Sequence, residues 1–243
     1  MLLLLLACGP SSLDEATRYD DISRLIEGGA LSGRTGLALR DRGLGPELAE
    51  LIASTPNDLV ELDLRGNLIG TRGAMALANS SELSGLETLI LAPGRVYVDG
   101  NRIGDAGVVS LAESSGLGAL TKLDLTKNEL GPKAGASLGW GPPALTTLIL
   151  DSNALGDAGA GGVSTRELDT LHLGWNGVTD DGAIALASGS FTTLLLAHNE
   201  IGQAGADALA AGLPKTGTLY LAGNGIPDTS GLEDRFGAGL RLE

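Results

Sequence analysis

The residues that could support chemistry are few. Among 243 residues there are two histidines, His172 and His198, and one cysteine, Cys8. These three cannot form a zinc site without carboxylate ligands. The chain contains no phosphate-binding loop motif, serine-nucleophile motif, zinc-peptidase motif or paired-cysteine motif. We therefore expect a non-enzymatic protein with no cofactor and no metal, and the single cysteine excludes an intramolecular disulfide.

Two segments are only weakly similar to ligand sites. Asp124, Thr126 and Asn128 alternate as in a calcium-binding loop, but the glycine and the final glutamate of such a loop are missing. Residues 156–162, GDAGAGG, are glycine-rich in the manner of a phosphate loop. Their glycines fall at positions that recur along the chain. We expect them to permit close packing of helices.

A repeated pattern of leucine and asparagine dominates the chain. The clearest unit, residues 59–78, reads L-x-x-L-x-L-x-x-N-x-I-G-x-x-G-A-x-x-L-A. A degenerate first unit has Arg42 at the asparagine position, and a degenerate last unit covers residues 219–226. Together they bring the count to about eight units, and atypical end units are usual in a solenoid. The repeated asparagines are Asn67, Asn101, Asn128, Asn153, Asn176, Asn199 and Asn224.

Each unit predicts one short strand and one short helix. In x-L-x-L-x the two leucines point into the core and the other side chains face outward, because strand side chains alternate. The asparagine that follows can bind backbone groups left unpaired at the turn, which predicts a ladder of stacked asparagines. The glycine- and alanine-rich remainder returns the chain as a helix of about two turns. The predicted fold is an α/β solenoid with one parallel sheet.

These units resemble the leucine-rich repeats of ribonuclease-inhibitor-like proteins. The resemblance is carried by N-R-I-G-D-A-G at 101–107 and N-E-I-G-Q-A-G-A-D-A-L-A at 199–210, and it covers roughly residues 34–227. It implies a curved horseshoe with the sheet on its concave face and short helices on its convex face. It also implies a recognition role, because family members are mostly protein-binding scaffolds and some regulate small GTPases. The present units are shorter than is usual in that family.

The two ends of the array are expected to carry caps. At residues 9–33 we predict a helical cap, with Ser12 and Glu15 forming a capping box. At residues 228–243, Leu232 and Phe236 precede Leu240 and Leu242, which predicts a helical turn followed by a ninth edge strand. Such caps cover the otherwise open ends of the core and protect the last strand edge.

Composition limits the partners. The net charge is −14 and the pI is about 4.4, without a cluster of lysine or arginine in the sequence. Binding to nucleic acid or to anionic lipid requires basic patches, so neither is expected. The remaining partner is another protein, whose identity the sequence does not reveal. We expect the chain itself to be monomeric.

The N-terminal residues 1–8 end in Leu5-Leu6-Ala7-Cys8, which resembles the lipidation signal of a bacterial lipoprotein. Lipidation of Cys8 would attach the protein to a membrane of the cell envelope. No lysine or arginine precedes this segment, in contrast to a typical secretory signal. The alternative is an ordinary apolar tail with one cysteine on a cytoplasmic protein.

The outward positions of the strands form lanes across the predicted concave face. Early units place charged residues there, including Arg40, Asp63 and Arg65, whereas late units place apolar and aromatic residues there. An exposed group of this second kind is typical of the centre of a protein interface. The alternative is that strand-forming residues only stabilise the sheet through cross-strand pairs. The candidate binding residues are Ile149, His172, Trp175, Leu195, His198 and Tyr220.

An insertion interrupts the third unit. Nine residues, Ala92–Gly100, separate Leu91 from Asn101, where other units have two. The insertion should leave the rim of the concave face and carry Arg95 and Tyr97, as a recognition loop or as neutral variation in length. The sequence as a whole predicts a protein-binding scaffold. The alternatives are a regulator of a small GTPase, of the GTPase-activating type, and a structural protein of the cell envelope.

Overall fold

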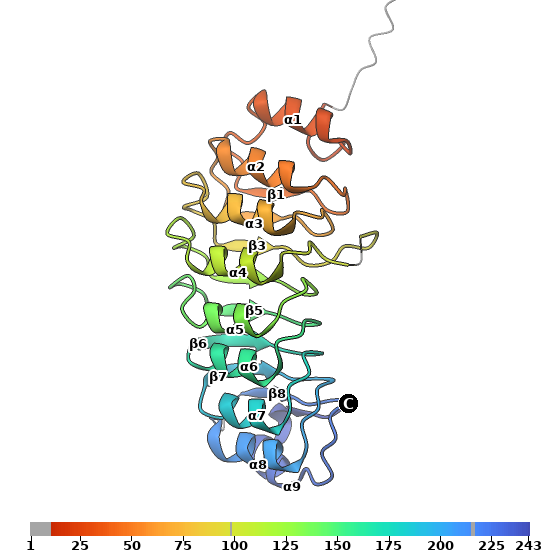
Figure 1. Ribbon diagram of the computed structural model, residues 1–243, viewed down its shortest axis with the longest axis vertical. Helices are drawn as coiled ribbons and strands as arrows, with labels where there is room; N and C mark the ends of the chain where they lie inside the picture. The colour runs from red at the N-terminus through yellow and green to blue at the C-terminus, as the bar shows by residue number, and fades with distance from the viewer. Residues whose placement is uncertain (1–10, 98, 215–216) are drawn as a thin grey trace, which may run out of the picture.

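The repeats fold into a solenoid whose strands form one continuous sheet. The computed structural model describes residues 11–97, 99–214 and 217–243. The strands lie in chain order, and each pairs in parallel with the next (Figure 1). The strands of the described residues are β1 Gly36–Ala38, β2 Glu61–Asp63, β3 Thr88–Ile90, β4 Lys122–Asp124, β5 Thr147–Ile149, β6 Glu167–His172, β7 Ser190–Leu195, β8 Thr218–Tyr220 and β9 Leu240–Arg241.

Short helices alternate with the strands and stack in a second layer on one side of the sheet (Figure 1). Most of them run for seven to nine residues, in agreement with the two turns expected from the unit length. They are α1 Tyr19–Glu27, α2 Pro46–Ser54, α3 Gly70–Ala78, α4 Gly104–Ala112, α5 Pro132–Leu138, α6 Gly156–Ser164, α7 Asp180–Leu186, α8 Gln203–Gly212 and α9 Ser230–Phe236. None of these described helices has both the length and the apolar character needed to cross a membrane.

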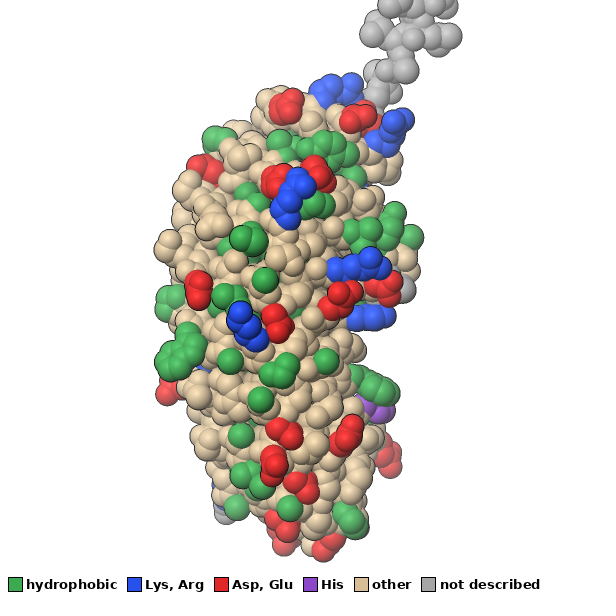
Figure 2. All heavy atoms as spheres, in the orientation of Figure 1, with side chains coloured by type: hydrophobic (Ala, Val, Ile, Leu, Met, Phe, Trp, Pro, Cys, Tyr) green, Lys and Arg blue, Asp and Glu red, His purple; other side chains and the backbone are tan. Residues whose placement is uncertain are grey.

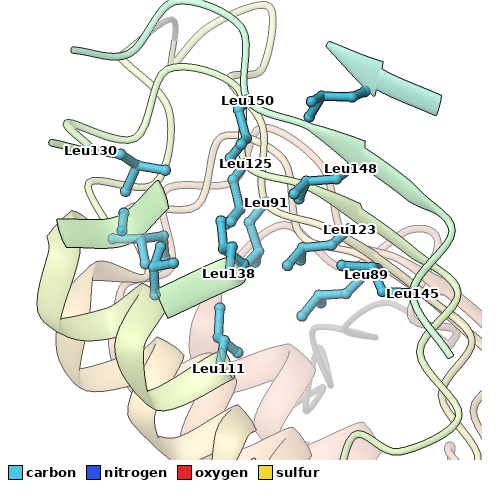
Figure 3. Close-up of a cluster of buried hydrophobic side chains, with 14 of the residues drawn as sticks. Leu89, Leu91, Leu111, Leu123, Leu125, Leu130, Leu138, Leu145, Leu148 and Leu150 are labelled. Carbon is cyan, nitrogen blue, oxygen red and sulfur yellow. The ribbon is translucent and has the colours of Figure 1, made fainter. Parts of the chain in front are cut away.

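The core is a strip of leucines between the two layers. The two leucines of each Leu-x-Leu pair point from the sheet toward the helices, and Leu111 and Leu138 meet them from α4 and α5 (Figure 3). These side chains are fully buried. The glycines of residues 156–162 allow the helices to approach, since a Cβ at Gly162 would lie 2.5 Å from the Cα of Ala136. The packing role expected for this segment is confirmed.

The asparagine ladder lies at the end of each strand. Asn199 is representative: its Oδ1 accepts hydrogen bonds from the backbone N–H groups of Asn176 and Val178, both at 3.0 Å. Its Nδ2 donates to the carbonyl oxygens of Leu173 and Leu196, both at 2.9 Å. One side chain thus satisfies turn groups in two successive units. The ladder predicted from the repeat is confirmed.

The ladder ends at the first unit, where arginine replaces asparagine. Arg42 turns away from the ladder and donates to the carbonyl oxygens of Leu13 (2.8 Å) and Asp14 (3.3 Å). Within the described residues, Oδ1 of the buried Asn67 has no hydrogen-bond partner, whereas Oδ1 of Asn101 accepts from two backbone N–H groups of the preceding unit. Arg42 instead attaches the N-terminal segment to the array.

A second ladder joins the helices. In three units an aspartate in the first turn of one helix accepts a hydrogen bond of 2.7 Å from a backbone N–H at the start of the next helix. The carboxylate compensates the unpaired N–H groups and positive dipole of that helix end. The pairs are Asp105 with Gly131, Asp157 with Thr179, and Asp180 with Gly202.

Both ends of the array are covered. At the N-terminus α1 buries Ile22 and Ile26, but it begins at Tyr19, later than the Ser12–Glu15 capping box would place it. Glu15 instead accepts hydrogen bonds from the N–H and hydroxyl of Ser11, so the predicted capping box does not start the helix. At the C-terminus α9 buries Leu232 and Phe236, and β9 forms the expected ninth strand beside β8.

Candidate binding surface

Four candidate residues form one row across the outer face of the sheet. The register pairs Ile149 with His172, His172 with Leu195, and Leu195 with Tyr220. Neighbouring parallel strands lie about 4.8 Å apart, so the four side chains are contiguous. Each is half-buried. These four residues, together with Trp175 and His198, are called the aromatic patch below.

Trp175 and His198 form the exposed part of the aromatic patch. Each follows a strand at equivalent positions of consecutive units, and their rings stack with centroids 4.2 Å apart and an interplanar angle of 20°. Trp175 is 60% exposed. Both side chains of the pair are exposed to solvent.

The backbone at these two positions is unfavourable for a residue with a side chain. Trp175 has a φ of 57° and His198 a φ of 54°, in the left-handed region that favours glycine. Glycine occupies the equivalent position in three other units, as Gly66, Gly100 and Gly223, and the remaining three units have Asp41, Lys127 and Ser152 there, also with positive φ. A non-glycine residue in this conformation costs on the order of 1 kcal/mol. The turn accepts several residue types at this cost, and its conformation gives no preference for an aromatic side chain.

Polar contacts hold the two half-buried polar members of the aromatic patch in place. The Nδ1 atom of His172 lies 3.4 Å from Oδ2 of Asp151, whose other oxygen accepts a hydrogen bond of 2.7 Å from the N–H of Gly174. The hydroxyl of Tyr220 donates to the carbonyl oxygen of Glu243 at 3.0 Å. Sequence reasoning did not single out Asp151, although its position two residues after β5, the strand that pairs with the strand of His172, was a usable signal.

The insertion folds back over the first unit. The carboxylate of Asp41 accepts hydrogen bonds from the backbone N–H groups of Arg95 (2.9 Å), Val96 (2.9 Å) and Tyr97 (3.4 Å). Tyr97 is half-buried, and its ring lies where a Cβ at Gly43 would be. Arg95 and Val96 remain exposed. Asp41 thus ties the insertion to the first unit, and the use of Arg95 and Tyr97 in recognition stays a prediction.

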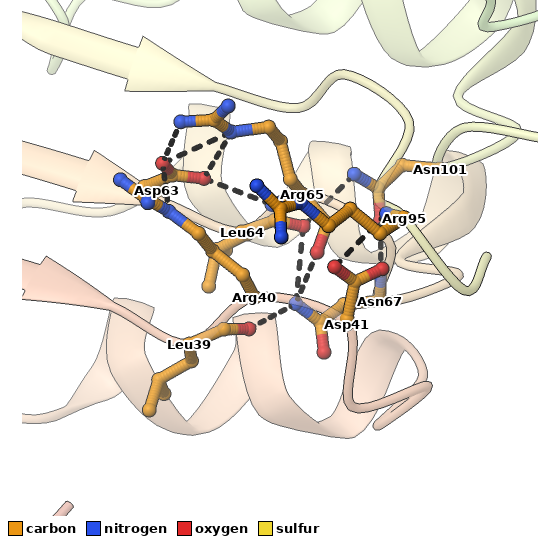
Figure 4. Close-up of polar contacts among 9 residues, drawn as sticks. All are labelled: Leu39, Arg40, Asp41, Asp63, Leu64, Arg65, Asn67, Arg95 and Asn101. Carbon is orange, nitrogen blue, oxygen red and sulfur yellow. Dashed lines mark hydrogen bonds and ion pairs between the residues drawn. The ribbon is translucent and has the colours of Figure 1, made fainter. Parts of the chain in front are cut away.

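The early units differ most from expectation at Asp63. Sequence reasoning placed this carboxylate among exposed charges, but it is fully buried. Arg40 Nε donates to it at 2.6 Å, and Arg65 donates to it from both Nε and Nη2 (Figure 4). Burial opposes ionisation of Asp63, but the hydrogen bonds from Arg65 and Arg40 outweigh burial and hold its pKa below the ordinary value. Two long side chains thus cover a charge that the strand register directs outward.

The segments with weak similarity to ligand sites have their groups engaged within the fold. Asp124 Oδ1 accepts hydrogen bonds from the N–H of Thr126 (3.1 Å) and from its hydroxyl (2.7 Å), and Asn128 belongs to the asparagine ladder. In the part of the chain that the structure describes, no three His, Cys, Asp or Glu side chains lie together as a metal site requires. The proposed lipidation residue, Cys8, lies outside the described residues.

Charge is distributed unevenly along the solenoid. The first 140 residues contain 12 of the 16 lysines and arginines and 18 of the 30 acidic residues, a net charge of −6. The remaining residues contain 4 basic and 12 acidic residues, a net charge of −8. On the face shown in Figure 2, basic side chains accordingly lie mainly in the N-terminal half. The aromatic patch lies in the more acidic half.

Comparison with known proteins identifies the repeat. A family model described as Leucine Rich repeat matches six segments, residues 55–78, 95–112, 120–139, 143–164, 168–187 and 190–210. These segments together cover just over half of the chain and include the units that carry most of the aromatic patch. No curated protein matches the chain significantly.

Proposed function

The chain belongs to the leucine-rich repeat family, whose members are generally non-enzymatic protein-interaction scaffolds, and from this premise we propose that it binds another protein at the aromatic patch. The observation that carries the proposal is the exposed Trp175–His198 stack next to the row formed by Ile149, His172, Leu195 and Tyr220. Aromatic residues dominate the binding energy of protein interfaces. The pair places a large exposed aromatic surface beside the half-buried row of the sheet.

The rest of the patch supplies a site of suitable form. Ile149, His172 and Leu195 continue the stack into a half-buried row, so that a partner side chain meets apolar surface next to a polar rim. Regular strands hold the row rigidly, which reduces the entropy lost on binding. The proposed partner is therefore a protein that presents an apolar or aromatic anchor to this row.

Substitution of Trp175 by glycine provides a direct test, because glycine is the residue that the backbone conformation prefers. The chain from residue 9 onward is immobilised as wild type, Trp175→Gly and Trp140→Ala, and binding proteins are identified from lysate. Trp140 is a matched control because it is 83% exposed but follows α5, away from the patch.

The proposal expects one partner to be retained by wild type and Trp140→Ala and lost by Trp175→Gly. Equal retention by all three proteins would move the binding site elsewhere on the solenoid. Stimulation of a small GTPase by the purified chain, without stable complex formation, would favour the GTPase-regulator alternative.

We further propose that Cys8 is lipidated and that the protein is anchored at the cell envelope. Support comes from the sequence Leu5-Leu6-Ala7-Cys8 alone. Anchoring of this kind would leave the solenoid in solvent, attached through its N-terminal segment and free to meet a partner.

A further inference from the structure

A second feature of the outer face is a groove lined with arginine. It has a volume of about 530 Å³ and is lined by Arg40, Asp41, Arg65, Pro93, Gly94 and Arg95, which we call the arginine groove. It lies at the rim of the sheet, between the first two units and the insertion (Figure 4). Three guanidinium groups in one groove are unusual in a chain with 30 acidic and 16 basic residues.

The buried Asp63 carboxylate orients two of these guanidinium groups. Arg40 donates only its Nε to Asp63, and Arg65 donates its Nε and Nη2. A guanidinium carries five N–H donors, so N–H groups remain on both side chains. The side chains are 52% and 35% exposed, respectively. Their remaining donors are therefore held in position and open to solvent, which is the arrangement that favours recognition of a carboxylate.

Asp41 determines which kind of anion the groove can accept. The consecutive backbone N–H groups of Arg95, Val96 and Tyr97 would otherwise suit the terminal carboxylate of a peptide. Asp41 already occupies all three N–H groups. It also positions the Arg95 backbone so that the exposed side chain adds a third guanidinium to the groove. The donors left for a ligand are thus arginine side chains.

The charges within the groove favour a single negative charge. Arg40, Arg65 and Arg95 contribute three positive charges, and Asp41 and Asp63 contribute two negative charges. Asp124, which does not line the groove, is close enough to act on Arg65 and reduces the net positive charge there. With so little net positive charge available, a singly charged carboxylate suits the groove better than a doubly charged phosphate.

From these contacts we infer that the arginine groove binds a side-chain carboxylate of an acidic segment on the partner protein. This inference rests on the proposed scaffold function for its biological role, but the contact itself can be measured without the natural partner. It adds to that function a second, chemically distinct contact point about four strand spacings, or roughly 19 Å, from the strand that precedes Trp175.

The experiment uses a tetraglutamate peptide with an acetylated N-terminus and an amidated C-terminus. Binding to the ¹⁵N-labelled protein is followed through the Nε–Hε NMR signals of its arginines. We expect saturable shifts of Arg40, Arg65 and Arg95, and no shift with the equivalent tetraglutamine peptide. Arg95→Gln should weaken binding by about threefold or more. Arg24→Gln, an exposed control on α1 with the same change in charge, should leave it unchanged.

Several outcomes would overturn the inference. Equal weakening by Arg24→Gln would indicate attraction by overall charge. Tighter binding of inorganic phosphate would assign the groove to phosphate, and tighter binding of tetraglutamine with a free C-terminus would assign it to terminal carboxylates. If the Arg95→Gln protein kept the wild-type melting temperature and bound tetraglutamate as tightly as wild type, Arg95 would take no part in the site. Loss of the natural partner in Trp175→Gly, without any binding of tetraglutamate, would leave the proposed function standing and reject only the groove.

Discussion

The indole ring of Trp175 stacks on the imidazole ring of His198 across two adjacent repeats, with centroids 4.2 Å apart. The stack is built on two residues with positive φ, a conformation that three other units give to glycine and three to Asp41, Lys127 and Ser152. The fold therefore tolerates this aromatic pair at a local cost. Because the pair is exposed and the turn does not require it, mutation of the pair should affect binding more than folding.

Trp175→Gly should weaken partner affinity by about 2 kcal/mol or more, because aromatic anchors carry much of an interface's energy. Its free energy of unfolding should stay within about 1 kcal/mol of wild type, since relief of the positive φ offsets the lost stacking. Isothermal titration with the purified partner and urea unfolding measure the two quantities. Trp140→Ala should change neither, and a large loss of stability in Trp175→Gly would show that the stack is structural.

Asn176→Ala should destabilise the protein by about 1–3 kcal/mol, because backbone groups of the turn would lose their partners in a buried place. Asn176 is 2% exposed, and its Nδ2 donates to the carbonyl oxygens of Leu150 and Gly174, both at 3.0 Å. The midpoint of urea unfolding measures the effect. Asn79→Ala is the control, since Asn79 is exposed at the end of α3. Equal midpoints for the two variants would contradict the role of the ladder.

Asp157→Ala should destabilise by about 1–3 kcal/mol, the usual range for hydrogen bonds to a charged group. Its carboxylate accepts from the N–H (2.7 Å) and hydroxyl (2.8 Å) of Thr179 and from the N–H of Gly182 (3.0 Å). Loss of these bonds leaves the start of α7 uncapped from the neighbouring unit. Asp181→Ala removes an exposed acid from the same helix turn and serves as the comparison in thermal melts. A smaller effect at Asp157 than at Asp181 would reject the second ladder.

Acid should destabilise the early units through Asp63 and Asp41. At Asp41 burial opposes ionisation, but backbone hydrogen bonds from Arg95, Val96 and Tyr97 hold its pKa below the ordinary value, as the arginines do for Asp63. A carboxyl with a lowered folded-state pKa stabilises the fold above its unfolded pKa, about 3.9, and this stabilisation disappears as pH falls through the folded-state pKa.

The free energy of unfolding should therefore decline from about pH 5 downward, and less steeply in Asp63→Asn than in wild type. Asp63→Asn should also be less stable at neutral pH, because Arg40 and Arg65 lose their anionic partner. Asn176→Ala, which is destabilised without loss of a carboxylate, should keep the wild-type pH dependence. Urea unfolding at a series of pH values distinguishes these cases, and parallel curves for wild type and Asp63→Asn would contradict the assignment.

If Cys8 carries a lipid, the protein should sediment with membranes, and Cys8→Ser should release it into the soluble fraction. Each buried methylene of an acyl chain contributes about 0.8 kcal/mol to membrane binding. Fractionation of cells that produce the two proteins, with mass spectrometry of the N-terminus, checks this. Soluble wild-type protein that retains its N-terminal methionine would reject lipidation without affecting the scaffold proposal.

Much of the fold could be predicted because the repeat determines it locally. Leucines at fixed spacing predict the core side of each strand, and the same spacing aligns Ile149, His172, Leu195 and Tyr220 in the observed register. The asparagine ladder follows from the hydrogen-bonding needs of a turn that recurs in every unit. These features depend on contacts between adjacent repeat units, and the residues that make those contacts recur at similar spacing along the sequence.

The remaining features depend on contacts that do not repeat. Burial of Asp63 requires two flexible arginines to fold over it, and strand alternation alone places the carboxylate on the outer face. The attachment of Arg95 to Asp41 joins residues 54 positions apart, outside any repeated spacing. The delayed start of α1 at Tyr19 follows no cap that sequence rules recognise. Each of these three features is set by contacts of individual residues, which the repeat pattern of the sequence does not specify.

The clamp made by Asp41 also affects how the solenoid should unfold. In a stack where each repeat touches only its neighbours, the terminal unit can detach first and the next can follow. Asp41 belongs to the first unit but holds an insertion of the third, across the turn of the second. Loss of the first unit should therefore also loosen the third. We expect these three repeats to unfold as one cooperative block and progressive fraying to begin at the opposite end of the array.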